Sequence, residues 1–524
     1  MTRYAEPAAV QRALLQRLRQ AARVLLGSSS APPVPATPDD PAAESAALLH
    51  ELVTLARTSG RSDVVWLLLV AVSARFPTDD GVRTARRRLE LAEPADGELW
   101  LLERGLGTLG PSADPLTEID LVTGGVLVDV DFSARHDLNT GIQRVVRSTM
   151  PVWTRDHDLT LVVWTAPTAL RLPDQRELAR VLHWSDREST PALAPTPRTA
   201  PPATGTGVPA APPRRIVVPW RSVLVLSEVP APDLCAPVAA LAEHSGNVVT
   251  AIGYDCIPVV SADMMPPVEP NRFVRYLTIL KHARRISGIS ASATAEFQGY
   301  SHMLPAQGLT GPDVVECLLP VEVPAGAGTQ DPAGPSGAAH TGPPLVVVVG
   351  SHEPRKNHLA VLHAAERLWR EGREFRLQFI GGSSWASGGF DDVVTRLRRA
   401  GRAVTVGRAV GDGELWAAYR AARFTVFPSL HEGFGLPVAE SLAVGTPAIT
   451  SSFGSTEEIS RDGGTLLVDP RDDDALTEAM RRLLTDDALV ARLHDEAVAR
   501  PARTWEDYGR ELWQQLVDDV RVAP

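Results

Sequence analysis

The stretch Phe427-Pro-Ser-Leu-His-Glu-Gly-Phe-Gly-Leu-Pro-Val-Ala-Glu440 decides the fold prediction. It reads as a strand ending at Phe427, a loop with two glycines, and a short helix opened by Pro437. A helix N-terminus presents unpaired N–H groups to an anion. Glu432 in the loop and Glu440 in the helix place two carboxylates beside that point. A phosphate site flanked by two acceptors for hydroxyl groups predicts a sugar-nucleotide site at the carboxyl end of a strand. The alternative is an ordinary strand–loop–helix corner with surface glutamates.

The composition limits the domain organisation and the classes of partner. A chain of 524 residues is too long for one hydrophobic core, so two or three domains are expected. The net charge of -11 excludes a nucleic-acid partner held by overall charge. The three cysteines lack disulfide or metal spacing, and no apolar run approaches the ~18 residues of a membrane span. With no signal-peptide pattern at the N-terminus, the expected location is the cytoplasm.

Residues 1–115 are predicted to form an α-helical extension. Within residues 8–26, apolar side chains recur on one helical stripe formed by Leu14, Leu18, Ala22 and Leu25. Arginines surround this stripe. Such a helix either packs on its own protein, the interpretation that we favour, or associates peripherally with the inner face of the plasma membrane. Further helices are expected at 43–58, 63–75 and 80–91. The pair from Asp63 onward resembles a tetratricopeptide-like hairpin, and the extension is a candidate site for a protein partner.

From about residue 120, apolar strands alternate with helices, which is typical of parallel α/β domains. The first strands are expected at 125–131, 159–164, 222–227, 248–252 and 286–289, and the first helices at 141–150, 174–182, 232–243 and 271–284. A second series of strands is expected at 345–349, 376–380, 403–406, 424–427 and 447–450. The predicted fold class is therefore α/β, with two Rossmann-like domains facing across a cleft.

Composition also sets the expected domain boundaries. The first Rossmann-like domain is predicted over residues 116–325, with an insertion near 190–214 whose Pro, Thr and Ala content predicts disorder. A linker rich in Gly, Pro and Ala is expected at 326–343. The second domain is predicted at 344–500, and a terminal helix at 501–524 is expected to cross back to the first domain.

A second candidate stretch, Gly350-Ser-His-Glu-Pro-Arg-Lys-Asn357, directly follows the apolar strand 345–349. Arginine binds phosphate as a fork and lysine as a point charge, so Arg355 and Lys356 are suited to neutralise a departing diphosphate. Only two of the 52 basic residues are lysines, namely Lys281 and Lys356. The alternative for this pair is an ordinary solvated pair of basic residues on the surface.

A third stretch, Thr140-Gly-Ile-Gln-Arg-Val-Val-Arg147, opens the first helix of the first α/β domain. Its first residue and Gln143 make a capping-box pattern. Gly141 allows a ligand to come close, and Arg144 shares a helical face with the last arginine. A well-capped helix with exposed arginines is the alternative interpretation.

A fourth stretch, Gly253-Tyr-Asp-Cys-Ile-Pro258, follows another strand of that domain. Asp255 at this strand end either binds a sugar hydroxyl or a base, or serves as a turn residue. The nearby Asp129-Val-Asp131 also ends a strand of the first domain, and we do not interpret it as a metal site.

Together these stretches resemble the retaining glycosyltransferases of family 4, the group 1 type, which have the two-domain GT-B fold. The resemblance covers residues 120–520 and is strongest over 345–470. The segments that follow the order and spacing of the family are 350–357, 407–422 and 427–459. The third stretch is similar to the N-terminal signature of a bacterial polysaccharide-building subset, some of whose members transfer mannose. The first 110 residues lie outside the resemblance.

The resemblance implies a role for each matched residue. Glu432 would contact hydroxyls of the donor sugar, and Glu440 would hold the ribose. The implied catalytic residues are Arg355, Lys356 and Glu432, and the implied donor-binding residues are Gly141, Gly350, Phe434, Gly435, Leu436 and Glu440. Asp255 and Arg144 are candidate acceptor or sugar contacts. Tyr254 stands where many members carry a histidine, and Ser351 where some carry an arginine.

The expected activity is retaining transfer of a mannose-like or glucose-like hexose to a hydroxyl of a glycan or lipid-linked acceptor, in cell-surface polysaccharide synthesis. The donor would be a GDP- or UDP-sugar, and no other cofactor is expected. No metal is required, because a lysine and an arginine would stand at the phosphates. Two alternatives remain open: an inactive binding or scaffold protein that keeps the fold, and a sugar-nucleotide epimerase.

Overall fold

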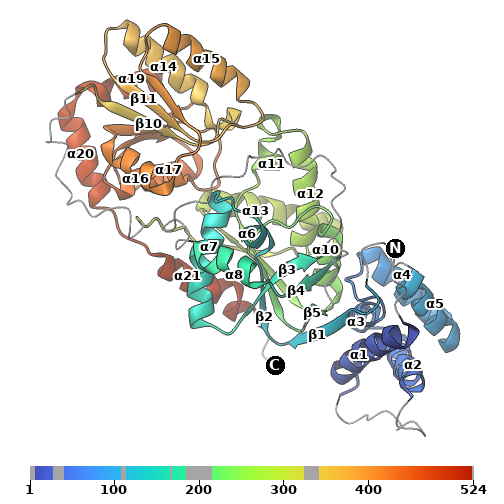
Figure 1. Cartoon of the computed structure of the whole chain (residues 1–524). Coiled ribbons are helices and arrows are strands. Elements are labelled where there is room, and N and C mark those ends of the chain that lie inside the picture. Colours follow the sequence, from blue (N-terminus) through green and yellow to red (C-terminus); the bar gives the residue numbers. More distant parts are fainter. Residues whose placement is uncertain are drawn as a thin grey trace.

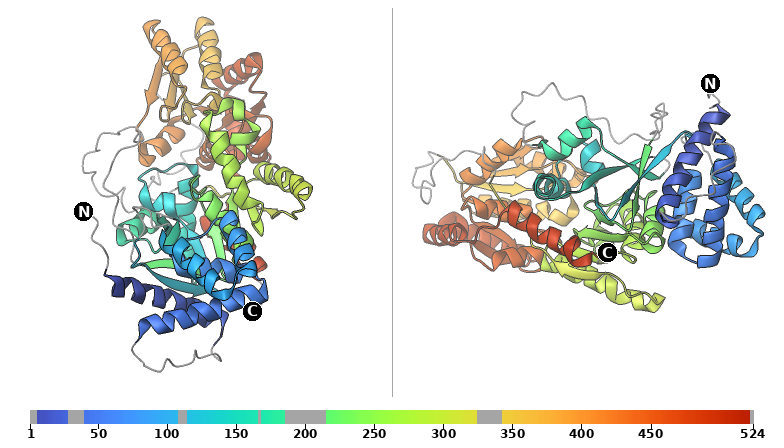
Figure 2. Two further views of the ribbon diagram at one scale, coloured as in Figure 1. Left: turned by 90° about the vertical axis from the view of Figure 1, so that its right-hand side faces the viewer. Right: turned by 90° about the horizontal axis from the view of Figure 1, so that it is seen from below.

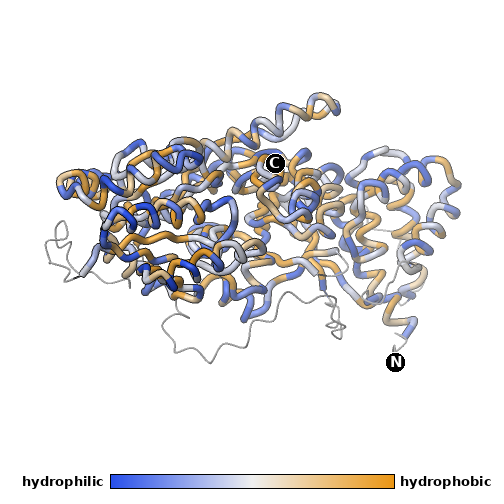
Figure 3. Tube along the Cα trace, turned by 90° about the horizontal axis from the view of Figure 1, so that it is seen from above, coloured by the Kyte–Doolittle hydropathy of each residue, from blue (hydrophilic) through white to orange (hydrophobic). Residues whose placement is uncertain are grey.

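The computed structural model describes residues 6–27, 40–107, 114–165, 168–184, 215–323 and 342–521. They form a helical bundle and two α/β units in a row, with the first α/β unit in the middle (Figure 1), an order that the views in Figure 2 also show. Apolar stretches run through all three parts (Figure 3). None of the described helices combines the length and the apolar character needed to cross a lipid bilayer.

The N-terminal bundle packs four helices around a fifth, α3. The bounds are α1 Pro7–Leu25, α2 Pro41–Ser59, α3 Ser62–Ser73, α4 Asp79–Leu91 and α5 Pro94–Gly107. Every residue from Val64 to Val72 is buried, so α3 has apolar side chains on all sides of this stretch and no polar face toward water. The sequence does not predict α5. The tetratricopeptide likeness of α3 and α4 stays a prediction.

Helix α1 closes the outer edge of the first sheet. Gln16 donates from Nε2 to the carbonyl of Ile119 at 2.8 Å and accepts from the N–H of Ile119 at 3.0 Å. The strand β1 (Glu118–Thr123) pairs with β5 (Arg215–Trp220) along one edge. Along its other edge, the Gln16 amide bonds to the backbone of Ile119 as a neighbouring strand would. The helix packs against α2, α3 and β1, so its apolar stripe faces its own protein.

Arg17 corrects the expectation that the arginines of α1 surround the stripe in water. Its side chain is buried, and it donates to the carbonyls of Ala71 and Thr117, each at 2.7 Å. Burial lowers the pKa of Arg17 to about 10. The reason is local: the last carbonyls of a helix lack intrahelical donors, and Ala71 lies at the C-terminal end of α3.

The first sheet has the strand order β1-β5-β4-β3-β2-β6-β7-β8-β9. Its pairs are parallel except those of β4, which is antiparallel to β3 and β5. The remaining bounds are β2 Val126–Asp129, β3 Thr160–Thr165, β4 Ala169–Arg171, β6 Val223–Leu226, β7 Val248–Gly253, β8 Arg285–Gly288 and β9 Asp313–Glu316. The accompanying helices are α6 Asp131–Arg135, α7 Gly141–Asp156, α8 Gln175–Leu182, α10 Cys235–His244, α11 Ile257–Val260, α12 Val268–Leu280 and α13 Ala291–Met303.

The second sheet is wholly parallel and has the order β12-β11-β10-β13-β14-β15. Its strands are β10 Leu345–Val349, β11 Arg376–Ile380, β12 Val404–Gly407, β13 Phe424–Phe427, β14 Ala448–Ser451 and β15 Thr465–Val468. Its helices are α14 His358–Arg370, α15 Gly388–Arg399, α16 Asp412–Ala421, α17 Leu436–Ala443, α18 Gly454–Ser460, α19 Asp473–Thr485 and α20 Asp487–Val498. The strands β10, β11 and β12 follow one another toward one edge of the sheet, and β13, β14 and β15 follow one another toward the other edge. The strand order therefore reverses between the neighbours β10 and β13.

The last helix, α21 (Trp505–Leu516), leaves the second unit and lies on the first (Figure 1). The indole N–H of Trp153 donates to the carbonyl of Gly509 at 2.7 Å, and the hydroxyl of Thr250 donates to the carbonyl of Leu516 at 3.1 Å. One continuous hydrophobic core contains residues of α7, α17 and α21. The two α/β units are thus packed together by apolar contacts as well as joined by the chain.

Several sequence predictions need correction. The strands β1, β4, β5, β9 and β15 are not predicted, because they are short edge strands, carry charged residues or adjoin the Pro-rich insertion. The capping box at Thr140 is wrong, because its hydroxyl donates to the side chain of Gln143 and no cap of the backbone forms. The insertion at 190–214 and nearly all of the linker at 326–343 lie outside the described residues.

We expect Arg17→Ala to lower the free energy of unfolding by about 2 to 4 kcal/mol, because it leaves buried carbonyl groups without donors. Arg19→Ala is the matched control, since Arg19 is exposed and pairs with Glu44 at the surface, an interaction worth at most about 1 kcal/mol. Urea unfolding followed by circular dichroism measures both. Equal losses in the two variants would contradict the assigned role of Arg17.

Candidate functional site

The reversal of strand order brings two of the predicted stretches together. Open α/β sheets bind ligands outside the carboxyl ends of the strands at such a reversal. The loop after β10 and the loop after β13 are joined there by the carbonyl of Arg355, which accepts from the N–H of Leu430 at 2.8 Å. Gly350 and Gly381 end the adjacent strands, and a Cβ at Gly381 would lie 1.9 Å from the Gly350 carbonyl oxygen.

The centre of this region is the carboxylate of Glu432. Its Oε1 accepts from the ammonium of Lys356 at 2.6 Å and from the hydroxyl of Ser429 at 2.6 Å. The guanidinium of Arg355 lies 2.9 Å from the same oxygen and also donates to the carbonyl of His431 at 2.6 Å. The side chains of all three charged residues are 11 to 12% exposed, so the group forms a largely buried cluster of charges.

The charge state of the cluster follows from this geometry. Burial alone would raise the pKa of Glu432, but Lys356 and Arg355 outweigh it and lower the pKa to about 2. Burial lowers the pKa of Lys356, against the attraction of Glu432. The ammonium also lies 4.9 Å from the ring centroid of Phe427, a cation–π contact. Glu432 is therefore an anion at neutral pH, and in this structure it accepts hydrogen bonds.

The two glycines of the loop, Gly433 and Gly435, are required for different structural reasons. A Cβ at Gly433 would lie 2.4 Å from the carbonyl oxygen of Tyr254, so the loop touches the backbone of the first unit there. Gly435 has φ of 109°, a conformation that favours glycine, immediately before α17. In the described part of the chain, the N–H groups of Phe434, Gly435 and Leu436 have no protein acceptor, so they remain open to an anion.

Glu440 lies in a different environment from Glu432. It is buried in α17, where Oε2 accepts from the hydroxyl of Tyr419 at 2.8 Å and Oε1 pairs with the guanidinium of Arg144 from the first unit. Gly141 is close by, because a Cβ there would lie 3.6 Å from the Leu436 side chain. The predicted corner at 140–147 therefore faces α17 across the boundary between the units.

Arg147, which shares a helical face with Arg144 in the sequence, has a structural role instead. It donates to the carbonyls of Ser133 at 3.1 Å and His136 at 2.8 Å, and stacks on the ring of Trp184 at 3.6 Å. It is buried, so the alternative of exposed arginines on this helix is wrong for Arg147.

Asp255 lies where the two units meet, beside Gly433. It accepts from the N–H of Ile257 at 3.0 Å, and burial raises its pKa to about 6. The geometry thus supports both a turn role and a place at the site. The neighbouring Tyr254 turns inward and donates to the carbonyl of Ser227 at 2.7 Å, so its phenol is part of the core of the first unit.

Other predicted positions are also occupied by local partners. The Ser351 hydroxyl donates to Glu353 at 2.6 Å, and Glu353 in turn lies 3.1 Å from Arg355. The Asp129 carboxylate accepts from the indole N–H of Trp164 at 2.8 Å. Asp131 accepts from the Trp164 backbone at 2.8 Å and pairs with an arginine of α6. These carboxylates therefore serve the local fold of the first unit.

A polar group that the sequence does not predict joins the two units at the same place. His431 lies 2.5 Å from Glu296 through Nε2 and 2.7 Å from the Ser261 hydroxyl through Nδ1. Ser290 donates to the carbonyl of Gly433 at 2.6 Å. Only the position of His431 beside Glu432 offered a signal, because its partners lie far away in the sequence.

Comparison with known proteins assigns the second unit. Residues 334–500 match the family model described as "Glycosyl transferases group 1", so the chain contains a group 1 glycosyltransferase domain. The serotype-specific mannosyltransferase WbdA of Escherichia coli is 25% identical over 359 residues, covering 65% of this chain and 39% of that protein. The O-antigen chain mannosyltransferase B of Escherichia coli is 37% identical over 144 residues, covering 27% of this chain and 36% of that protein. The chain thus spans less than half the length of these relatives.

Solved structures share the arrangement of the α/β units. The N-terminal domain of Candida albicans trehalose-6-phosphate phosphatase superposes with a TM-score of 0.51 at 12% identity, covering 76% of this chain and 97% of that one. Anabaena HepE, solved with UDP and glucose, gives 0.50 at 10% identity, covering 75% and 99%. At such low identity these likenesses establish the fold alone. The predicted α/β class with the GT-B arrangement and an N-terminal helical region is confirmed.

We expect the stability that Glu432 contributes to depend on pH. Its folded-state pKa of about 2 lies below the usual 4.5, so the contribution is complete above pH 4.5 and is lost as pH falls toward 2. The free energy of unfolding of Glu432→Gln should therefore fall below that of the unmodified chain by about 3 kcal/mol at pH 7, and the gap should narrow below pH 4.5. Urea unfolding between pH 7 and pH 3 measures it, with the exposed Glu90→Gln as control. A gap that does not change with pH would refute the assignment.

Proposed function

We propose that the chain is a retaining glycosyltransferase that moves a hexose from a nucleoside-diphosphate sugar to a hydroxyl group of a glycan or lipid-linked acceptor. The observation that carries the proposal is the buried group of Arg355 and Lys356 around Glu432, at the strand reversal of a group 1 glycosyltransferase domain. The relatives named as mannosyltransferases support a mannose-like sugar, and the donor base is proposed to be guanine or uracil.

In this proposal the two cations stabilise the leaving group. When the bond between the anomeric carbon and phosphate breaks, negative charge grows on the diphosphate, and fixed donors at that point lower the barrier. The Nε of Arg355 is buried and has no hydrogen-bond partner within the described part of the chain, so a phosphate oxygen would satisfy this donor once the guanidinium turns toward it. With both cations present, the step needs no divalent metal.

The carboxylates act as acceptors for donor hydroxyls. Glu432 already orients both cations, and its low pKa makes it unsuited to act as a general acid. It is therefore proposed to orient the sugar through its hydroxyls, while the acceptor hydroxyl attacks from the face that the diphosphate leaves and gives its proton to the leaving phosphate. Glu440 is proposed to hold the ribose, which requires it to share or exchange its contact with Arg144.

The first α/β unit is proposed to bind the acceptor. Gly141, Arg144 and Asp255 are among its residues that lie against the second unit, next to the proposed donor site. Peripheral association with a membrane and a protein partner for the helical bundle remain predictions.

Lys356→Ala is expected to lower kcat by about 100-fold or more, because it removes one of two cations at the leaving group. Lys281→Ala is the matched control, since Lys281 is the only other lysine of the chain and lies just after α12, away from the cluster. Release of nucleoside diphosphate measures turnover, and thermal unfolding checks that both variants fold. Turnover of a folded Lys356→Ala close to that of Lys281→Ala would remove the leaving-group role.

Nucleotide binding separates the proposal from its alternatives. GDP or UDP should raise the Tm of the chain, because a ligand that binds the folded state stabilises it, and Glu440→Gln should weaken this rise. ADP serves as the base control. If no nucleotide raises the Tm and no donor releases its diphosphate, a non-catalytic binding protein is the better description. An epimerase would convert the donor without any acceptor, which analysis of the products detects.

A further inference from the structure

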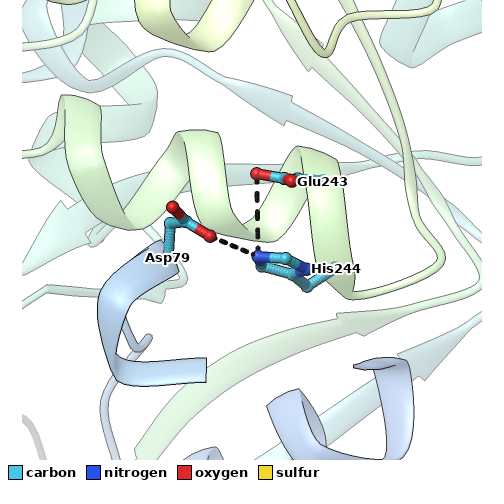
Figure 4. Close-up of side chains that lie close together, drawn as sticks. All are labelled: Asp79, Glu243 and His244. Carbon is cyan, nitrogen blue, oxygen red and sulfur yellow. Dashed lines mark hydrogen bonds and ion pairs between the residues drawn. The ribbon is translucent and has the colours of Figure 1, made fainter. Parts of the chain in front are cut away.

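Three side chains of types that ligate metals meet between the helical bundle and the first α/β unit (Figure 4). The bundle and the second α/β unit lie on opposite sides of the first unit (Figure 1). Asp79 is the first residue of α4 in the bundle. Glu243 and His244 are the last two residues of α10 in the first α/β unit. A fourth, His282, follows α12 by two residues and lies beside Glu243. Three elements distant in the sequence therefore contribute to one group.

The distances fit the first coordination sphere of a small cation. His244 Nε2 lies 2.8 Å from Asp79 Oδ1 and 3.6 Å from Glu243 Oε2, and His282 Nε2 lies 3.4 Å from that same Glu243 oxygen. In a tetrahedral zinc site with bonds of about 2.0 to 2.1 Å, neighbouring ligand atoms are about 3.3 Å apart. The observed separations bracket this value, and the ligand atoms of Asp79, Glu243 and His244 lie within reach of one ion. His282 contacts this group through Glu243, so its side chain must turn toward the ion to become the fourth ligand.

We propose that Asp79, Glu243, His244 and His282 form a structural site for one zinc ion that fastens the helical bundle to the first α/β unit. Two imidazoles and two carboxylates are a ligand set that zinc accepts, and four protein ligands are typical of structural sites. Among the described residues, the first three are the one group of metal-ligating types found within reach of a common ion.

The charges of the group and the burial of its imidazoles support this assignment. The side chains of His244 and His282 are 9% and 10% exposed, while those of Asp79 and Glu243 are 42% and 27% exposed and so leave a path by which an ion can enter. Two carboxylates would balance the charge of a divalent cation. Arg83 now lies 2.6 Å from Asp79 and 3.2 Å from Glu243, but its side chain is 50% exposed and can turn into water when an ion enters.

The site would be independent of the proposed catalysis. It joins α4 to α10, and α10 lies on the helical layer of the first sheet, so metal would raise the stability of the junction without touching the donor cleft. This separates its test from any assay of sugar transfer.

Zinc binding is measured by isothermal titration calorimetry on the full chain, after treatment with a chelator and removal of any polyhistidine tag. The expected result is one zinc ion per chain, with a rise in Tm on adding zinc. Cobalt(II) should give the visible absorption typical of four-coordinate cobalt, a readout that does not depend on enzymatic activity.

The variants Asp79→Asn and Glu243→Gln keep the shapes of the side chains and should each weaken zinc binding by about tenfold or more. His282→Ala should weaken binding and reduce the cobalt absorption. The matched control is His50→Ala, because His50 pairs with Glu98 at 2.8 Å in the same bundle but has only this one partner among the described residues. This control should bind zinc as tightly as the unmodified chain.

The proposal fails if the chelated chain binds no zinc, or if Asp79→Asn and Glu243→Gln bind it with unchanged affinity. Equal weakening by His50→Ala would show that zinc binds surface histidines without selection, and would also overturn the site. His244→Ala would also remove a ligand, but His244 is buried and its loss can destabilise the fold. The conclusion therefore rests on Asp79→Asn and Glu243→Gln, which keep the shape of the side chain.

Discussion

The carboxylate of Glu432, held by Lys356 and Arg355, is the interaction on which the geometry of the site depends. It joins the loop after β10 to the loop after β13 at the place where the strand order reverses. A buried charge without partners is strongly destabilising, so each member of this group requires the others. The same requirement fixes the two cations before any ligand arrives, which is the condition for electrostatic stabilisation of a transition state.

The contact between the two α/β units follows a consistent pattern. Glu458 in α18 accepts from the N–H groups of Ala291 at 2.9 Å and Ser292 at 2.6 Å, and so caps α13 of the other unit. In the opposite direction, Arg144 of the first unit reaches Glu440 in α17. Close backbone contact at Gly433 lies between these polar links. Helix ends and charged groups therefore set the alignment of the units, while apolar residues of the shared core supply buried contact between them.

The sequence carries much of this architecture because the second unit follows simple rules. Its strands at 345–349 and 424–427 are apolar runs, and the strand at 376–380 includes Arg376 and Gln378 among its apolar residues. The structure has all three with the same bounds. Local signals also place Lys356 and Glu432 at strand ends, although nothing in the sequence shows that they form an ion pair. Glu440 shows the limit more sharply, because its partner Arg144 is 296 positions away. Such long-range pairing depends on how the units dock, which no local period encodes.

The first unit and the bundle were harder to predict for physical reasons. The strand β5 begins directly after the insertion and contains Pro219, so its composition resembles a loop. Arg17 carries a charge that local patterning assigns to water, yet it serves carbonyl groups that only the folded bundle brings to it. Where a polar side chain bonds to groups that are distant in the sequence, the hydropathy pattern of its helix predicts exposure to water for a side chain that is in fact buried.

Helix α21 has a mechanical consequence. Because it returns to the first unit, the chain crosses the boundary between the α/β units twice, once before β10 and once between α20 and α21. The second crossing is held at both ends, because α20 packs on α17 and α21 packs on α7. Separation of the two units must therefore either turn the second unit about this short connection or pull α21 from α7, so α21 limits how far the contact between Arg144 and Glu440 can open.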